Sequence, residues 1–233
     1  MELLSTIYQR MKNTTSRFDL TNEDEYNRHA QYLLRCADSL LARQGKTFVV
    51  DDTNKAILRF LLYYFNDCPR AEDVLINGKT YKLGNPILLN GKVGVGKTLI
   101  MDAFALYLKQ TKNQNAFLPT SMSEILNYYK VNGHLDEYMY NVGKNSIDGN
   151  PRAICINDIG LQQQRYFGED MQMVVNDLMF ARYEIWTQTG ICCHLTTNLS
   201  TKDIKQVFFD SNGRLVDRFK IYNVINLSGD SRR

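Results

Sequence analysis

One short stretch of the chain has the composition and spacing of a phosphate-binding loop. Between Gly91 and Thr98 the sequence reads Gly-Lys-Val-Gly-Val-Gly-Lys-Thr, which matches the pattern Gly-x-x-x-x-Gly-Lys-Thr. The glycines let the backbone curl so that several N–H groups point into one concavity, where a polyphosphate binds. Lys97 can reach the β- and γ-phosphates of a nucleotide, and the Thr98 hydroxyl can hold Mg²⁺. The residues expected to contact the nucleotide are Gly91, Lys92, Val93, Gly94, Val95, Gly96, Lys97, Thr98 and Leu99.

A loop of this kind must end a strand and begin a helix, so that the positive end of the helix dipole faces the phosphates. Both flanks agree with this requirement. Residues 86–89 are a short apolar run, and residues 99–108 have the composition of a helix. The alternative is a glycine-rich turn before an ordinary core helix. The complete motif with both flanks favours nucleotide binding.

Two polar residues come at or just after the ends of later buried-type strands. Asp158 follows the apolar residues 153–156, and Asn198 follows residues 191–197. At the carboxyl edge of a parallel sheet, an acid such as Asp158 is placed to bind Mg²⁺ or to orient a water molecule. Asn198 could hydrogen-bond the γ-phosphate or the attacking water. The alternatives are an Asp that caps a turn and an Asn that serves as a turn residue.

Arg214 and Arg218 are four positions apart and therefore lie on one face of a helix. An arginine can stabilise the charge that develops on a transferring phosphoryl group, within one chain or from a neighbouring subunit. A solvated basic surface is an equally good reading of either residue alone.

These candidate residues require a scaffold of alternating strands and helices. Short apolar runs at 86–89, 116–119, 153–156, 191–197 and 224–227 alternate with helix-like segments, which predicts an α/β fold with a parallel sheet flanked by helices. Residues 1–70 are expected to form a small helical N-terminal region, and residues 71–233 the nucleotide-binding domain. Within the latter, Asn77-Gly78 predicts a hairpin turn.

The composition is that of an ordinary globular protein. The 233 residues are 44% hydrophobic and 23% charged, with a net charge of +3. No apolar run approaches the roughly 18 residues of a membrane span, and the first residues lack a secretory signal, so we expect a cytoplasmic protein without a membrane partner. The five cysteines form no C-x-x-C pair, which predicts reduced thiols and no zinc site. The small net charge permits nucleic-acid contact but does not argue for it strongly.

The motifs taken together resemble the DnaC/DnaI/IstB-like family of AAA+ ATPases, which are helicase loaders and transposition helpers of bacteria and phages. The resemblance covers roughly residues 84–233. Family members carry, in this order, a phosphate loop, an acidic strand end, an Arg-Tyr pair, a Thr-Thr-Asn-Leu-Ser segment, an Arg-x-x-Asp-Arg segment and often a closing Gly-x-Ser-x-Arg. The matching segments here are 91–98, 156–160, 182–183, 196–200, 214–219 and 229–233.

The resemblance implies a RecA-like AAA+ P-loop NTPase core and assigns roles to the candidate residues. Asp158 falls on the acid that polarises water, and Asn198 falls on the first sensor residue. Arg218 falls on the arginine finger that acts on a neighbouring subunit, with Arg214 beside it. The chain departs from the family at Asn157, where the usual residue is a Mg²⁺-associated Asp. Asn can accept a hydrogen bond from a Mg²⁺-bound water but brings no charge, which implies slow hydrolysis more than weak ATP binding.

The expected function is that of an ATP-binding AAA+ ATPase in DNA replication, similar to a helicase loader. The expected ligands are ATP or ADP with Mg²⁺, single-stranded DNA, and a replicative DnaB-type helicase or a transposase, and a homo-oligomer is expected with ATP. By the resemblance, the N-terminal region would select the protein partner. Three alternatives stay open: an IstB-like transposition helper, a P-loop nucleotide kinase, and a non-hydrolysing nucleotide-switch scaffold. The kinase is disfavoured because the stretch 141–152 offers only Lys144 and Arg152 for an arginine-rich lid.

Overall fold

The computed structural model describes residues 18–140, 151–160, 165–166, 169–208 and 213–232. None of the helices in these ranges is long and apolar enough to cross a membrane. The stretch 141–152, considered above for an arginine-rich lid, falls largely on residues 141–150, outside the described ranges.

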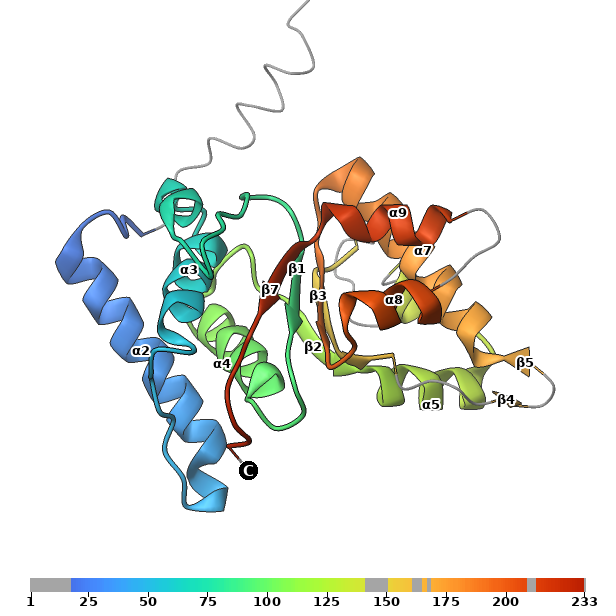
Figure 1. The fold of residues 1–233 in the computed structure, drawn as a ribbon, viewed down its shortest axis with the longest axis horizontal. Helices are drawn as coiled ribbons and strands as arrows, with labels where there is room; N and C mark the ends of the chain where they lie inside the picture. Colours follow the sequence, from blue (N-terminus) through green and yellow to red (C-terminus); the bar gives the residue numbers. More distant parts are fainter. Residues whose placement is uncertain (1–17, 141–150, 161–164, 167–168, 209–212, 233) are drawn as a thin grey trace, which may run out of the picture.

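The centre of the fold is a five-stranded parallel sheet in the order β2-β3-β6-β1-β7 (Figure 1). Its strands are β1 (Ile87–Asn90), β2 (Leu118–Ser121), β3 (Ile154–Ile159), β6 (Cys193–Thr197) and β7 (Asn223–Asn226). The inner strands are buried on both faces, as apolar runs between covering helices require. The predicted α/β fold with a parallel sheet is therefore confirmed.

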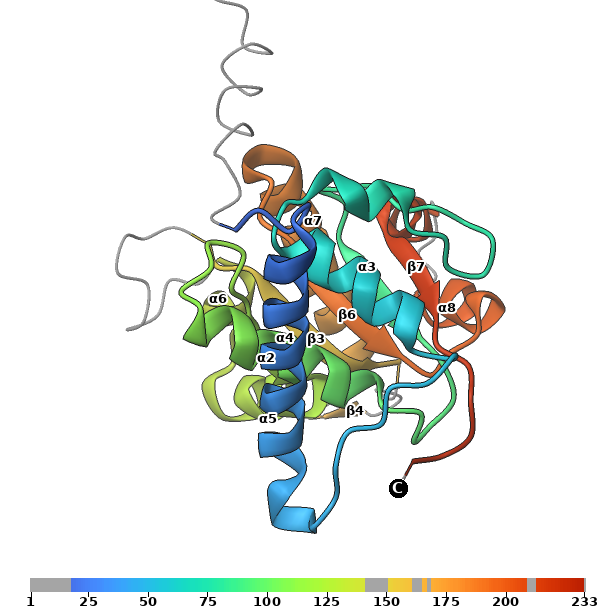
Figure 2. The same cartoon turned by 90° about the vertical axis from the view of Figure 1, so that its left-hand side faces the viewer.

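One face of the sheet is covered by the helices that come early in the chain. These are α2 (Glu23–Leu41), α3 (Lys55–Phe65) and α4 (Lys97–Gln110). Their apolar side chains form one hydrophobic cluster with those of β1. Seen from this side, α2 is the outermost element and lies over α4 (Figure 2). The helical N-terminal region is thus present and packs on the helix that follows the phosphate-binding motif, and the domain boundary at residue 70 stays a prediction.

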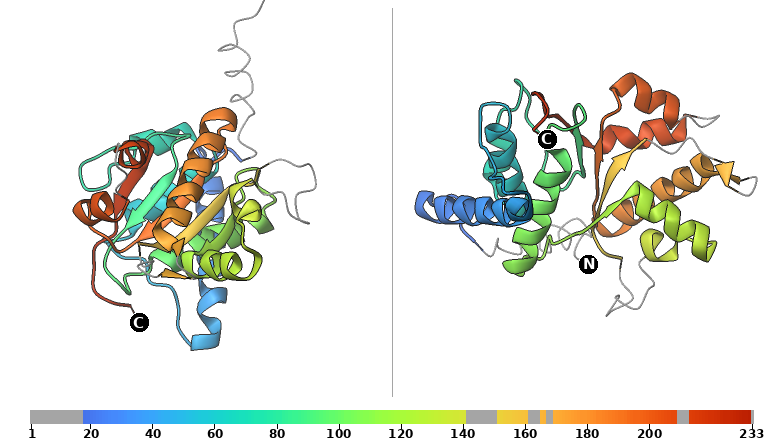
Figure 3. Two further views of the ribbon diagram at one scale, coloured as in Figure 1. Left: turned by 90° about the vertical axis from the view of Figure 1, so that its right-hand side faces the viewer. Right: turned by 90° about the horizontal axis from the view of Figure 1, so that it is seen from below.

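The other face is covered by helices from the second half of the chain, so the sheet lies between two helical layers (Figure 3). These elements are α5 (Met122–Asn132), α6 (Asp136–Met139), α7 (Met171–Thr189), α8 (Thr201–Val207) and α9 (Arg214–Arg218). Short 3₁₀ helices lie at Ala42–Gln44, Pro69–Asp73 and Phe219–Ile221, and a small hairpin pairs β4 (Arg165–Tyr166) with β5 (Glu169–Asp170).

Three helix starts follow from local capping chemistry. The side chain of Asn22 accepts a hydrogen bond from the Glu25 amide at the start of α2. Ser121 caps α5, and Ser200 forms a capping box with Asp203 at the start of α8. Each cap satisfies an amide that has no acceptor within its own helix.

Two expectations from the sequence need correction. The strand expected at 116–119 is β2 at Leu118–Ser121, because the Ala116 amide already donates to Asn113 in a turn, whereas the Leu118 amide donates to Ala153 beside β3. The hairpin turn forms, with φ of 52° at Asn77 and 75° at Gly78, but its arms pair only through Ile76 and Lys79. Beyond that pair the second arm hydrogen-bonds toward β7 instead.

A buried arginine hydrogen-bonds to the chain on both sides of the segment between α6 and β3. Arg182 on α7 is 1% exposed. Its guanidinium donates to the carbonyls of Tyr138 and Met139, at 3.4 and 3.5 Å, and to that of Arg152, at 2.6 Å. Because these carbonyls stand on the two sides of residues 140–151, Arg182 ties both ends of that segment to α7.

His194 is a structural residue of β6. It is buried, and its Nδ1 accepts a hydrogen bond from the Ile87 amide of β1 at 3.1 Å. The rings of Phe65 and Phe117 lie edge-on to it, each with a centroid distance of 5.3 Å. Burial, with a smaller effect from the charge of Arg182, lowers the pKa of His194 to about 3. The imidazole is therefore neutral at physiological pH.

This burial predicts a specific loss of stability in mild acid. An unfolded histidine titrates near pH 6.5, so below that pH the unfolded chain binds a proton at His194 and the folded chain does not. The free energy of unfolding should therefore fall as the pH falls, by about 2 kcal/mol from pH 7 to pH 5 at this residue. Urea unfolding of the wild type and of His194→Asn, whose amide oxygen can replace Nδ1, measures the difference. His29 is present in both proteins, and equal pH dependence in the two would contradict the assignment.

Candidate functional site

The phosphate-binding motif connects β1 to α4 at the carboxyl edge of the sheet (Figure 1). Gly94 and Gly96 have φ values of 87° and 100°, a left-handed backbone that other residues rarely adopt. Gly91 is required for a different reason, since a Cβ there would collide with the carbonyl oxygen of Leu227. Gly96 is also the N-cap of α4, so the helix begins inside the loop and its first amides have no intrahelical acceptors. This backbone fits a polyphosphate.

Lys97, the first residue of α4, is buried despite its charge. Its Nζ donates to the carbonyls of Gly91 and Lys92, at 2.7 and 2.9 Å. The ammonium group is therefore held across the loop by the loop's own backbone, and its charge lies beside the residues expected to hold phosphate. Lys92, by contrast, is exposed.

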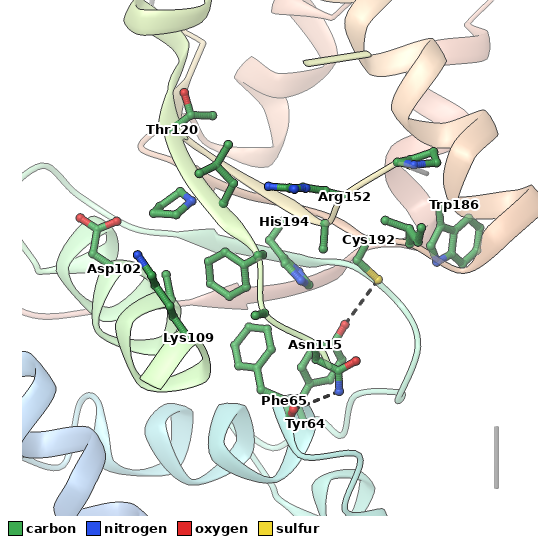
Figure 4. A pocket seen from close by; sticks show the side chains of 18 of the residues that line it. Tyr64, Phe65, Asp102, Lys109, Asn115, Thr120, Arg152, Trp186, Cys192 and His194 are labelled. Carbon is green, nitrogen blue, oxygen red and sulfur yellow. Dashed lines mark hydrogen bonds between the residues drawn. The ribbon is translucent and has the colours of Figure 1, made fainter. Parts of the chain in front are cut away.

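A cleft of about 1700 Å³ runs along α4 and β2 from the phosphate-binding motif. Thr98, Asp102, Asn157 and Asp158 belong to its lining near the motif. Figure 4 shows Asp102 on α4 at one side of this cleft and Trp186 at the other. The carboxyl end of β3 and the first turns of α4 thus share one solvent-accessible space.

Asp158 has an unusual backbone conformation. It has φ of 57°, and the pairing of β3 with β6 shifts register between Ile156 and Ile159. The Asp158 amide donates to the Thr196 hydroxyl at 3.0 Å instead of continuing the ladder. A bulge of this kind re-aims a side chain, and here the Asp158 side chain is exposed at the cleft. Strained residues concentrate at functional sites, which supports the candidate role of Asp158.

Asn157 is buried and its amide group is oriented by two neighbours. Its Oδ1 accepts a hydrogen bond from the Thr196 hydroxyl at 3.1 Å, and its Nδ2 donates to Oδ1 of Asp102 at 3.5 Å. Burial raises the pKa of Asp102, the hydrogen bond from Asn157 lowers it, and the negative charge of Asp158 raises it further. The sequence did not single out Asp102, because its position inside a helix gives no local signal.

Asn198 follows β6, the neighbour of β1 in the sheet. Its Oδ1 is buried and has no hydrogen-bond partner in the part of the chain that the structure describes. A buried acceptor without a donor is costly, so this atom fits a ligand or a water molecule that donates to it. The predicted sensor residue therefore has a free acceptor beside the strand that leads into the motif.

Arg214 and Arg218 are not brought to the loop of their own chain. They lie on α9, which leads through a short 3₁₀ helix into the amino end of β7, whereas the loop follows the carboxyl end of β1 (Figure 1). The guanidinium of Arg218 stacks over the rings of Phe180 and Tyr183, 4.6 and 4.9 Å from their centroids, and donates to the Arg214 carbonyl at 3.2 Å. This placement gives neither arginine a role at the loop of its own chain.

Two segments that had no assigned role are linked to the loop, residues 229–232 directly and residues 49–53 through Arg232. The Arg232 amide donates to the Gly94 carbonyl at 2.9 Å, and a Cβ on Gly94 would collide with Ser231. The Arg232 guanidinium donates to Oδ2 of Asp51 at 2.6 Å and to the Thr53 hydroxyl at 2.8 Å. Hydrogen bonds from Thr53 and from Arg232 lower the pKa of Asp51. The matching Gly-x-Ser-x-Arg residues at 229–233 were a signal for the first segment, whereas residues 49–53 carry no motif.

The donor set suits Mg²⁺ better than a transition metal. The hydroxyl of Thr98 and the carboxylates of Asp102 and Asp158 are hard oxygen donors, and Mg²⁺ usually binds one or two carboxylates together with water and phosphate oxygens. Within the described ranges, no group of three or more His, Cys, Asp and Glu side chains could hold a metal by itself. The predicted absence of a zinc site is not tested by this observation, but the oxygens present fit Mg²⁺ bound with a nucleotide.

Comparison with solved structures identifies the fold. The crystal structure of DnaI matches with a TM-score of 0.54 at 17% sequence identity, over 81% of this chain and 89% of that chain. Domain III of the replication initiation protein DnaA from Thermotoga maritima matches with a TM-score of 0.50 at 19% identity, over 78% of this chain and 65% of that chain. No protein-family model matches the sequence, and no curated protein matches it. The chain has the AAA+ P-loop NTPase fold, and the predicted resemblance to DnaI is confirmed at the level of the fold.

The left-handed conformation of Asp158 predicts an effect on stability that is independent of catalysis. Glycine tolerates this backbone, whereas alanine meets the steric penalty of a Cβ, which is roughly 1 kcal/mol or more. The variant Asp158→Gly should therefore unfold with a free energy about 1 kcal/mol higher than that of Asp158→Ala, as measured by urea denaturation. Equal stability of the two variants would show that the bulge at Asp158 is absent in solution.

Proposed function

We propose that the chain is an ATP-binding AAA+ ATPase of the DnaC/DnaI/IstB-like type that acts in DNA replication in the manner of a helicase loader. The observation that carries the proposal is the convergence of the phosphate-binding loop, Asp158 and Asn198 at one edge of a parallel sheet. The ordered series of family motifs and the fold similarity to DnaI support it. The proposed ligands are ATP with Mg²⁺, and single-stranded DNA together with a DnaB-type helicase are the proposed partners.

In the proposed reaction, a water molecule attacks the γ-phosphorus of ATP, the bond to the bridging oxygen breaks, and ADP and phosphate are released. Lys97 and the loop amides bind the phosphates, and Thr98 would hold Mg²⁺, which neutralises phosphate charge when bound. Asp158, re-aimed by its bulge, accepts a proton from the attacking water. Asn198 orients that water through its unpaired Oδ1. Arg218 stabilises the transition state in the site of a neighbouring subunit, with Arg214 beside it.

Two other functions differ in partner or in turnover. An IstB-like helper would use the same ATP site with a transposase as its partner. A nucleotide-switch scaffold that binds ATP without appreciable hydrolysis is favoured by one specific observation, namely the uncharged Asn157 at the position of the first acid. Co-precipitation with a replicative helicase or with a transposase distinguishes the two partners, and the ATP turnover of the pure protein distinguishes the switch.

The first test is the variant Lys97→Ala. Charge-assisted hydrogen bonds contribute about 1.5–3 kcal/mol each, so loss of the ammonium should weaken ATP binding more than about tenfold. Calorimetry measures the affinity. Lys92→Ala is the matched control. The contact expected of Lys92 with the nucleotide is made by its backbone N–H, which the substitution keeps, and its side chain is exposed, so the affinity of this variant should be close to that of the wild type. An unchanged affinity in folded Lys97→Ala would refute the nucleotide site.

The second test addresses the role of Arg218. Loss of an arginine finger lowers ATP turnover by roughly 10³–10⁵ where one operates, so Arg218→Ala should be nearly inactive. Mixing it with Lys97→Ala should restore part of the activity, because some interfaces then pair an intact loop with an intact arginine. The variant Lys220→Ala is the control, since Lys220 is exposed nearby and pairs only with exposed Asp217 among the described residues.

The measured rates distinguish three roles for Arg218. Wild-type turnover of Arg218→Ala would mean that the residue serves only to stack on Phe180 and Tyr183. An inactive variant without rescue would place its action within one chain. Only rescue in the mixture agrees with the proposed action between subunits.

A further inference from the structure

An uncharged residue of β3, Asn157, contacts an acid of α4, Asp102. Asn157, at the end of β3, stands where the family resemblance implies an acid. Asp102 lies on α4 four residues after Thr98, so the two side chains project from the same face of the helix. Thr98, Asp102 and Asn157 all line the same cleft. A carboxylate is therefore absent from position 157 of the strand but present at Asp102 on the adjacent helix.

The contact between Asn157 and Asp102 is specific in its polarity. The Asn157 amide oxygen accepts from the Thr196 hydroxyl, which leaves Nδ2 to donate to Asp102. An acid at position 157 would instead place two carboxylates in contact in a partly buried site, where like charges raise each other's pKa. A pair of one carboxylate and one amide avoids this repulsion, and in this chain the carboxylate is that of Asp102.

Asp102 has capacity for further hydrogen bonds. Among the residues that the structure describes, the one hydrogen bond to its carboxylate comes from Asn157, at 3.5 Å. An ionised carboxylate has about four lone-pair sites. Two other acids line this part of the cleft: Asp158, which is proposed above to act on the attacking water, and Glu124, which already accepts from the Thr120 hydroxyl at 3.0 Å at the start of α5. Asp102, one turn after Thr98 on the same face of α4, is thus placed to receive hydrogen bonds from water beside Thr98.

We propose that Asp102 supplies the negative charge on the Mg²⁺ side of the nucleotide site that position 157 lacks, and that Asn157 positions the Asp102 carboxylate. This inference rests on the proposed function and identifies a further residue of the same site. Mg²⁺ usually keeps several of its water ligands, and a carboxylate that accepts hydrogen bonds from such waters strengthens metal binding without direct coordination. The site then has an acid beside Thr98 although position 157 carries none.

The test measures ATP affinity by calorimetry with Mg²⁺ and again with a chelator in place of Mg²⁺. For Asp102→Asn, the gain in affinity that Mg²⁺ provides should be about 10- to 100-fold smaller than in the wild type, by analogy with other residues that support metal ligands. Without Mg²⁺ the variant should bind ATP at least as tightly as the wild type, because a negative charge near the triphosphate is gone. A purely structural role would weaken binding equally in both conditions and would overturn the proposal.

The exchanged variant Asp102→Asn/Asn157→Asp returns the charge to the strand and keeps one carboxylate and one amide in the pair. It should recover most of the Mg²⁺-dependent gain, and failure to recover it would overturn the proposal even if Asp102→Asn alone does not fold. Asp177→Asn, an acid of α7 outside the cleft lining, is the matched control. A wild-type Mg²⁺ response in Asp102→Asn, combined with lost ATP binding in Lys97→Ala, would refute the role of Asp102 and leave the proposed function standing.

Discussion

The parallel register of β1 with β6 on one side and β7 on the other is the constraint on which the site depends. Asn90 is level with Thr197 and with Asn226, so the three strands end together. The phosphate-binding loop, Asn198 and the segment after Leu227 therefore begin at the same height, although they are far apart in the sequence. Parallel strands present their carboxyl ends at one edge. A slip of one residue in one of these pairings would separate the loop from the neighbour on that side.

The neighbours of the loop limit its conformations as strongly as its own glycines do. Gly91 lies against the Leu227 carbonyl and Gly94 lies against Ser231. Arg232 connects this C-terminal segment to Asp51. The chain that follows β7 thus lies between the loop and the chain that precedes α3. Because α3 belongs to the hydrophobic cluster beneath α4, the packing of the early helices and the shape of the loop are mechanically connected. Such preorganisation reduces the ordering cost of binding a ligand.

Features of the fold that depend on neighbouring residues could be predicted from the sequence. Contacts between residues far apart in the chain could not. The phosphate-binding motif and the Asn77-Gly78 turn depend on residues a few positions apart, and they were recognised. The start of β2 was wrong by two residues because its pairing with β3 decides it, not its own apolar pattern. The contact of Asp102 with Asn157 and that of Arg232 with Asp51 cross 55 and 181 positions. Neither has a sequence signature, since a single Asp in a helix or in a loop is ordinary.

The buried guanidinium of Arg182 has a consequence for how this fold can diversify. It hydrogen-bonds to the carbonyls of Tyr138, Met139 and Arg152, so the chain leaves α6 and approaches β3 at fixed points whatever lies between them. For a connection with fixed ends, each doubling of its length costs only about 0.6 kcal/mol. A longer or shorter insert between residues 140 and 151 should therefore leave β3 unchanged. The position of Asp158, which lies on β3, would then be unchanged as well.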